Sequence, residues 1–222
     1  PIIHYNNYTR FDHKSQDLYV NAATEIISKS GITGGYCLDL ACGDGSLIYE
    51  LAKTTNLKII ALEKDKRKVD IARNKLNRSG LYGKRAVIFH GDKNTVPLPD
   101  YFANLIISQK SVDTGIPEDP EPEYLHFHRP CGGRMITGDP GEMKISVRGA
   151  LDGSGQWTHQ YHDPANTAIS EDFIVNGNLE MLWFKDSDFD MPSRHGRGVA
   201  PLFKDGLLFV AGNDWIRTVD AY

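Results

Sequence analysis

The residues best suited to ligand chemistry form one short turn, whose sequence is LDLACGDG over residues 38–45. An apolar run precedes the turn and a helix-like segment follows it, which is the setting that a glycine-spaced binding turn requires. Glycine suits such a turn because it adopts positive φ angles and lets the backbone lie against a ligand. The start of the following helix offers unpaired N–H groups. The turn therefore predicts a binding site for a small molecule.

The order of residues in this turn separates two classes of ligand. A dinucleotide fingerprint requires three glycines, in the pattern G-x-G-x-x-G. The chain has Gly43 and Gly45, but Leu47 and Ile48 follow, so the glycine that lets a pyrophosphate-binding helix pack closely is missing. The negative charge of Asp39 suits a cationic or amino-bearing ligand better than a pyrophosphate. A nicotinamide or flavin dinucleotide is therefore disfavoured.

Two further acids follow predicted strands. Glu63 stands directly after the apolar run 57–62, and Asp92 follows the run 86–90. Each acid alone is more often an ordinary surface residue. Ligands of open α/β sheets bind at the carboxyl ends of the strands, so we expect both acids to share one sheet edge with Asp39.

The elements that must position these residues alternate along the first part of the chain. The patterns predict helices over residues 16–27, 46–53, 66–78 and 121–128, and strands over 36–40, 57–62, 86–90, 103–108 and 134–137, with 143–149 as a candidate for a further strand. Apolar strands that alternate with helices are typical of a parallel sheet covered on both faces. The predicted fold class is α/β, with a Rossmann-like doubly wound, mostly parallel sheet.

The turn resembles motif I of the class I S-adenosylmethionine-dependent methyltransferases, usually LDxGxGxG, with Ala41 at the first glycine. Other landmarks follow in order. The run ANLIIS (103–108) resembles the family's fourth strand, with Asn104 in place of the usual aspartate. The run LHFHRPCGGRMI (125–136) resembles its helix-turn-strand segment L-x-R-x-L-R-P-G-G-x-L. The resemblance covers about residues 16–140.

This resemblance implies S-adenosylmethionine as the cofactor. By position in the motifs, Glu63 would take the ribose hydroxyls and Asp92 the adenine amino group. The cofactor-binding residues that it implies are Asp39, Ala41, Gly43, Gly45, Glu63, Lys64, Asp92, Lys93 and Ser108. No catalytic residue is assigned, because methyl transfer from a sulfonium mainly requires that the acceptor be positioned.

The resemblance further implies an enzyme that methylates an unidentified acceptor, which we expect to be a small molecule. The segment 108–112 lacks the N-P-P-Y-type stretch that marks methylation of base and glutamine amino groups. The alternative is a non-catalytic Rossmann-like binding or scaffold domain, because Ala41, Asn104 and the missing acceptor motif depart from the family pattern. A dinucleotide oxidoreductase is a weaker alternative.

Other clusters of polar residues predict no further site. His159, His162 and Asp163 have a spacing that a metal could use, but no helix is predicted there and no third soft ligand follows. We interpret Cys42 as a small buried loop residue. Residues 64–85 hold nine basic and two acidic side chains, which we interpret as a solvated helix face, since no aromatic residues are interleaved to stack bases.

The composition changes near residues 140–150. All three tryptophans lie beyond this point, and residues 150–222 are predicted to be an all-β, propeller-like segment after a methyltransferase-like domain at 1–149. Strands are expected over 177–184 and on both sides of 212–214. The run 201–222 resembles a quinoprotein-type (PQQ-like) β-propeller repeat. About 75 residues cannot close a propeller, so we expect the remaining blades in a longer parent chain.

Whole-chain composition excludes several classes of protein. The net charge is −4, with 40% hydrophobic and 24% charged residues, which is ordinary for a globular protein and gives no field for gathering nucleic acid. No apolar run approaches the roughly 20 residues of a membrane span. Three cysteines fit a reducing, cytoplasmic location. A periplasmic or secreted parent stays open, because the chain begins with proline and its start looks truncated.

Overall fold

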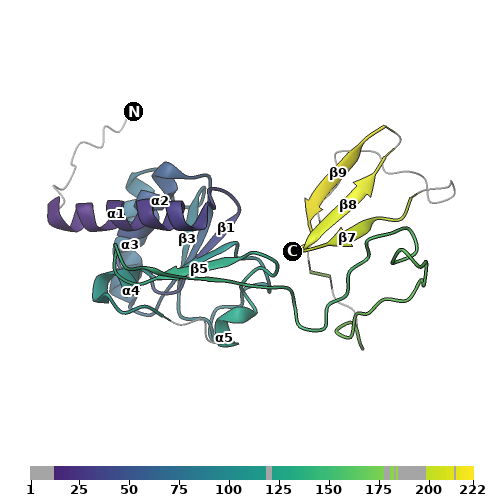
Figure 1. Ribbon diagram of the computed structural model, residues 1–222. Coiled ribbons are helices and arrows are strands. Elements are labelled where there is room, and N and C mark those ends of the chain that lie inside the picture. The colour runs from purple at the N-terminus through teal and green to yellow at the C-terminus, as the bar shows by residue number, and fades with distance from the viewer. Residues whose placement is uncertain (1–12, 119–121, 178–180, 183, 185–198, 213) are drawn as a thin grey trace.

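The computed structural model describes residues 13–118, 122–177, 181–182, 184, 199–212 and 214–222. Its first part is an α/β unit and its last part a small antiparallel sheet (Figure 1). Among the described residues, no helix is long and apolar enough to cross a membrane.

The larger sheet has six strands in the order β3-β2-β1-β4-β5-β6. Five strands run parallel: β1 (Tyr36–Asp39), β2 (Lys58–Glu63), β3 (Ala86–His90), β4 (Leu105–Ile107) and β5 (Arg134–Thr137). The sixth, β6 (Lys144–Val147), pairs antiparallel with β5. The predicted Rossmann-like, mostly parallel sheet is confirmed. The strand order reverses at β1, so the end of β1 is where an open sheet binds ligands.

Helices cover this sheet as the alternating pattern predicts. They are α1 (His13–Ser30), α2 (Ser46–Thr54), α3 (Lys66–Arg78), α4 (Gln109–Thr114) and α5 (Pro122–Leu125). Asp65 caps the start of α3 by accepting a hydrogen bond from the N–H of Arg67 at 2.8 Å. The helix expected over 121–128 is shorter, and α4 was not expected at all.

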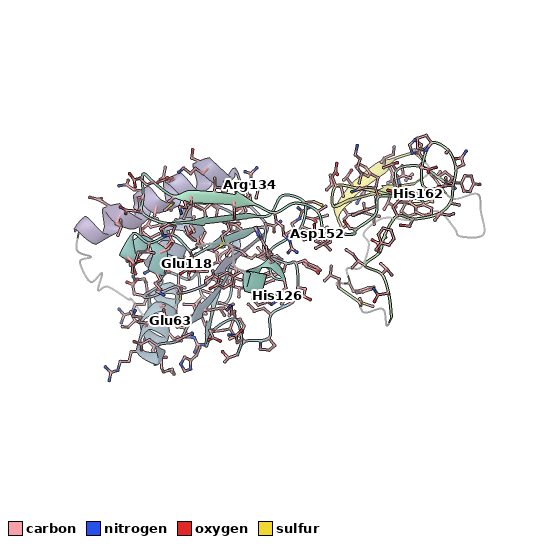
Figure 2. All side chains as sticks on the ribbon, turned by 60° about the horizontal axis from the view of Figure 1, so that its bottom comes forward. Glu63, Glu118, His126, Arg134, Asp152 and His162 are labelled. Atoms are coloured by element: carbon pink, nitrogen blue, oxygen red, sulfur yellow. The ribbon has the colours of Figure 1, made fainter. Side chains whose placement is uncertain are left out.

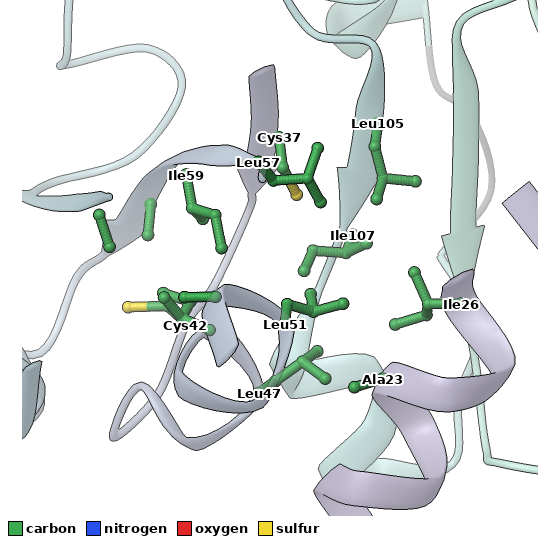
Figure 3. Packing of buried hydrophobic residues seen from close by; sticks show 14 of the residues in the cluster. Ala23, Ile26, Cys37, Cys42, Leu47, Leu51, Leu57, Ile59, Leu105 and Ile107 are labelled. Atoms are coloured by element: carbon green, nitrogen blue, oxygen red, sulfur yellow. The ribbon is translucent and has the colours of Figure 1, made fainter. Parts of the chain in front are cut away.

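The core has one layer on each face of the sheet. On one face, α1, α2 and α3 pack against the strands through buried side chains that include Leu76 of α3. Figure 3 shows Ile26 of α1 and Leu51 of α2 in this layer. On the other face, Leu38 packs with Phe127 and Met135. Cys37 belongs to the first layer and Leu38 to the second, as the alternation of a strand dictates. Each fully buried Leu or Ile contributes about 1.5–3 kcal/mol, so this core holds β1 and the turn after it firmly.

The C-terminal sheet is antiparallel, with the strand order β7 (Leu202–Lys204), β8 (Leu207–Ala211) and β9 (Ile216–Asp220). Strands β8 and β9 flank residues 212–214 as expected, and β7 is an additional strand. Of the strand expected over 177–184, the described residues 177, 181, 182 and 184 are not in a strand, and 178–180 and 183 lie outside the described residues.

A propeller is not shown by this sheet, because it has three strands and a propeller blade has four. The sheet contacts the α/β unit through Arg129, whose Nε donates to Asp220 Oδ2 at 2.6 Å. Tyr101 and Tyr222 form an edge-to-face ring pair across the same contact. The division of the chain at residues 149 and 150 stays a prediction.

Candidate functional site

The glycine turn has the backbone conformation that its sequence predicts. Gly43 has φ 54° and Gly45 has φ 76°, both in the left-handed region that favours glycine. A Cβ on Gly43 would lie 2.8 Å from Nε2 of Gln109, and a Cβ on Gly45 would lie 3.0 Å from Cβ of Ala72. Positive φ angles therefore favour glycine at both positions, and a side chain at either one would displace a neighbouring side chain.

Asp39 is fully buried at the end of β1 and ties the turn to α4. Its Oδ1 accepts hydrogen bonds from the N–H groups of Ala41 at 3.1 Å and Gln109 at 3.2 Å, whereas its Oδ2 has no hydrogen-bond partner. Burial raises the pKa of Asp39 to about 7. The two N–H groups act against this rise, and the negative charges of Glu118 and Glu63 add to it.

Glu63 at the end of β2 supports the same turn. Its Oε2 accepts the N–H of Gly43 at 2.8 Å and its Oε1 accepts the N–H of Asp65 at 2.9 Å. The residue is 9% exposed. Each carboxylate oxygen keeps a second lone pair, so Glu63 can also accept hydrogen bonds from two hydroxyl groups.

Asp92 follows β3 and is held by its own loop. Its Oδ1 accepts the N–H groups of Asn94 and Thr95, and its Oδ2 lies 2.9 Å from Nζ of Lys64. The hydrogen bond from Lys64, followed by that from Asn94, lowers the pKa of Asp92 to about 2. Lys93 places its ammonium 4.6 Å from the ring centre of Tyr124. Lys64 therefore lies beside Asp92, and Lys93 lies against Tyr124.

Ser108 caps α4 at the end of β4. Its Oγ accepts the N–H of Ser111 at 3.3 Å and donates to Oε1 of Glu118 at 2.9 Å. Glu118 was not singled out in the sequence, because it lies in a loop ten residues further on and no pattern joins it to Ser108. The structure thus adds a fourth carboxylate to the carboxyl edge of the sheet.

Gln109 is the second residue that sequence reasoning missed. It is 1% exposed, and its Nε2 donates to Oδ1 of Asp44 at 2.9 Å while its Oε1 accepts the N–H of Leu47 at 3.0 Å. Its Nε2 also lies 3.4 Å from the hydroxyl of Tyr19, which donates to Asp113 at 2.7 Å. The side chain thereby connects α1, α4, the turn and α2. The sequence does place Gln109 directly after the predicted buried strand 103–108, and a polar residue in that position could have indicated a role at the sheet edge.

Two other singled-out residues, Cys42 and Asn104, are structural. Cys42 is fully buried and its thiol pKa is raised by burial, which confirms its interpretation as a buried loop residue. Asn104 accepts the N–H of Tyr36 at 2.9 Å through Oδ1. Tyr36 begins β1. Asn104, which replaces the aspartate of the family pattern, therefore lies at the opposite end of the strands from the glycine turn.

Several side chains of the basic run 64–85 are bound to other parts of the fold. Arg73 donates to the carbonyl of Ile88 and Arg85 to those of Thr55 and Leu57. Lys75 lies 2.6 Å from Oδ2 of Asp44. These three side chains bind to the fold, so the prediction of a solvated helix face does not describe them.

The C-terminal segment holds histidines and a cavity, both remote from the turn. Within the part of the chain that the structure describes, no group of three or more His, Cys, Asp or Glu residues could hold a metal. Nδ1 of His162 instead lies 3.1 Å from Oγ1 of Thr167. A cavity of about 380 Å³ lies among residues of this segment that include Trp157, Phe203 and Tyr222.

Comparison with known proteins finds a family model that matches part of the α/β unit. Residues 37–126 match the model of a methyltransferase domain. This match, over less than half of the chain, agrees with the predicted methyltransferase domain. No curated protein matches the chain.

Solved structures resemble parts of the chain. A candidate S-adenosyl-L-methionine-dependent methyltransferase from Methanococcus maripaludis is 28% identical, covers 61% of this chain and 67% of its own, and has a TM-score of 0.48. A candidate sarcosine dimethylglycine methyltransferase from Galdieria sulphuraria is 16% identical over 56% of this chain and 46% of its own, with a TM-score of 0.44. A SAM-dependent methyltransferase from Aquifex aeolicus is 20% identical over 57% of this chain and 72% of its own, with a TM-score of 0.43. The assignment of residues 37–126 rests on the family match.

Proposed function

We propose that the α/β unit binds S-adenosylmethionine across the carboxyl ends of β1, β2 and β3, and that the chain transfers its methyl group to a small-molecule acceptor. The observation that carries the proposal is the hydrogen bond from Gly43 to Glu63. It joins a glycine turn in the left-handed conformation to a nearly buried acid at the end of the next strand.

The residues present fit this cofactor. The turn is a cradle in which a side chain at Gly43 or Gly45 would collide with its neighbours. Glu63 has two oxygens with lone pairs to spare, which suits a vicinal diol such as the ribose hydroxyls. Asp92 is an acceptor for an amino group, and Asp39 fixes the turn through Oδ1.

The protein's task in this reaction is to position the reacting groups. When bound, S-adenosylmethionine would supply a methyl group carried on a positively charged sulfur. Glu63 and the turn hold one partner in place, and Ser108 with α4 borders the space left for the other. Positioning of this kind accounts for much of the acceleration that methyl transfer needs.

Isothermal titration calorimetry on the whole chain tests the proposal. S-adenosylmethionine and its demethylated product, S-adenosylhomocysteine, should each bind with one-to-one stoichiometry, and NAD should not bind. Binding of NAD alone would indicate a dinucleotide enzyme and contradict the proposal. Failure of all three compounds to bind would favour a scaffold role.

For residues 150–222 we propose a propeller-like unit. The support is the antiparallel sheet β7-β8-β9, which supplies three of the four strands of a blade. An isolated antiparallel β-bridge joins Trp157 to Phe203 of β7 through two backbone hydrogen bonds.

A further inference from the structure

The first N–H groups of α2 are bound by side chains, although a helix leaves such groups without partners of its own. The N–H of Ser46 donates to Oδ1 of Asp44 at 3.1 Å, and the N–H of Leu47 donates to Oε1 of Gln109 at 3.0 Å. Asp44 belongs to the glycine turn, whereas Gln109 is the first residue of α4 and follows Leu47 by 62 residues. The start of α2 therefore takes its conformation partly from a distant element.

Gln109 also binds the rest of the turn. Its Nε2 donates to Oδ1 of Asp44 at 2.9 Å, and its backbone N–H donates to Oδ1 of Asp39 at 3.2 Å. The next residue, Lys110, donates its N–H to the carbonyl of Ala41 at 3.1 Å. The first residues of α4 are thus bonded to the glycine turn at its beginning and in its middle, and through Oε1 of Gln109 to the helix that follows it.

The amide of Gln109 is enclosed by the turn that it binds. Gln109 is 1% exposed and Leu47 is 0% exposed, so water has no ready access to the hydrogen bond between them. A Cβ on Gly43 would lie 2.8 Å from Nε2 of Gln109, so the amide lies in the space that a side chain at Gly43 would need. Figure 2 shows Glu63, whose Oε2 accepts the N–H of Gly43, in the α/β unit and well apart from His162 of the C-terminal segment.

The conformation of this turn decides how tightly a ligand binds to it. A ligand that requires one conformation binds with an apparent Kd that rises as the populated fraction of that conformation falls. We propose that Gln109 is a positioning residue for S-adenosylmethionine: its side chain acts by holding residues 44–47 in the binding conformation, not by contact with the reacting atoms. This inference rests on the proposed function.

Gln109→Met tests the inference, because methionine is unbranched and flexible like glutamine but makes neither hydrogen bond. Calorimetry on the whole chain should show that S-adenosylhomocysteine binds about tenfold more weakly than to wild type, as expected when a tenth of the molecules hold the binding conformation. Leu57→Ala is the matched control. Leu57 is fully buried and precedes β2, at the other end of that strand from Glu63, so its loss should lower thermal stability at least as much and leave the affinity unchanged.

A complementary pair of substitutions tests the contact itself. Gln109→Glu keeps an acceptor for the N–H of Leu47 but places a carboxylate against Asp44, so it should weaken S-adenosylhomocysteine about tenfold. Adding Asp44→Asn supplies an amide donor to that carboxylate, and at least half of the lost binding free energy should return. In the ligand-free proteins, amide exchange at residues 43–47 should be faster in Gln109→Met than in Leu57→Ala, since only the first change releases the turn.

The possible results separate the two proposals. If Gln109→Met binds S-adenosylhomocysteine as wild type does, or if Leu57→Ala loses as much affinity, Gln109 has a structural role only and the proposed function stands. If wild type does not bind S-adenosylhomocysteine, both proposals fail. If Gln109→Met does not fold, the comparison of Gln109→Glu with the double variant decides, and affinity that does not recover there contradicts the inference.

Discussion

At the scale of single residues, the carboxylate of Glu63 has two roles. It accepts the N–H groups of Gly43 and Asp65, and in the proposed function it also takes the ribose hydroxyls. Glu63→Ala should weaken S-adenosylmethionine binding by roughly 1.5–3 kcal/mol, the scale of hydrogen bonds to a charged group. Calorimetry measures the loss, and Glu142→Ala serves as the control. Unchanged binding by a folded Glu63→Ala protein would contradict the ribose assignment.

Asp39 should give the fold a distinctive dependence on pH. Its pKa is about 7 in the folded protein, above the ordinary value of 3.8. Between these two values the folded state binds more protons at Asp39 than the unfolded state does. The contribution of Asp39 to the free energy of unfolding should therefore fall as the pH rises from about 4 to about 7 and stay level above that.

Asp39→Asn removes this titration while it keeps an oxygen for the N–H groups of Ala41 and Gln109. Denaturant unfolding of both proteins from pH 4 to pH 8 measures the difference in stability. The advantage of wild type over Asp39→Asn should shrink with rising pH. A difference that is constant across this range would show that the carboxyl titrates normally.

At the scale of elements, the glycine turn depends on backbone geometry. Gly43→Val places a branched side chain at φ 54° and against Gln109, so it should destabilise the protein by about 1–3 kcal/mol and abolish cofactor binding. Thermal unfolding and calorimetry measure the two effects. Gly34→Val is the matched control, because a Cβ on Gly34 meets no atom within 4 Å. Full affinity in Gly43→Val would place the ligand elsewhere.

Much of this element pattern was predictable from the sequence. Strands and helices with strong apolar periodicity, such as α3 and β3, have the predicted bounds because burial and local preference agree there. Helix α4 was missed because its six residues, QKSVDT, carry no apolar stripe and are set by the Ser108 cap. The strand expected over 177–184 rested on apolar residues, yet Met181 and Phe184 are 76% and 79% exposed.

The candidate site was predictable only in part. Residues at strand ends could be found by position, since parallel strands bring their carboxyl ends to one edge. Gln109 and Glu118 could not, because their roles come from side-chain contacts across 62 and 10 residues of sequence. A side chain at Gly43 would also meet Gln109, a neighbour that the sequence pattern does not reveal.

At the scale of the whole molecule, the connection between the two sheets should be the first segment to be cleaved. Residues 152–153 and 159–161 are exposed, and this stretch has few strand hydrogen bonds beyond the Trp157–Phe203 pair. In limited proteolysis with a broad-specificity protease, the first strong cut should fall between Asp152 and Asn166. A chain that resists cleavage except at its termini would show that the C-terminal segment is integral to one domain.

The central claim is that S-adenosylmethionine binds at the glycine turn. Amide hydrogen exchange of the whole chain, with and without S-adenosylhomocysteine, tests it most directly. The account predicts slower exchange at residues 39–47 and 63–65, with little change across 151–175. Protection confined to the cavity around Trp157, or no protection at all, would contradict it.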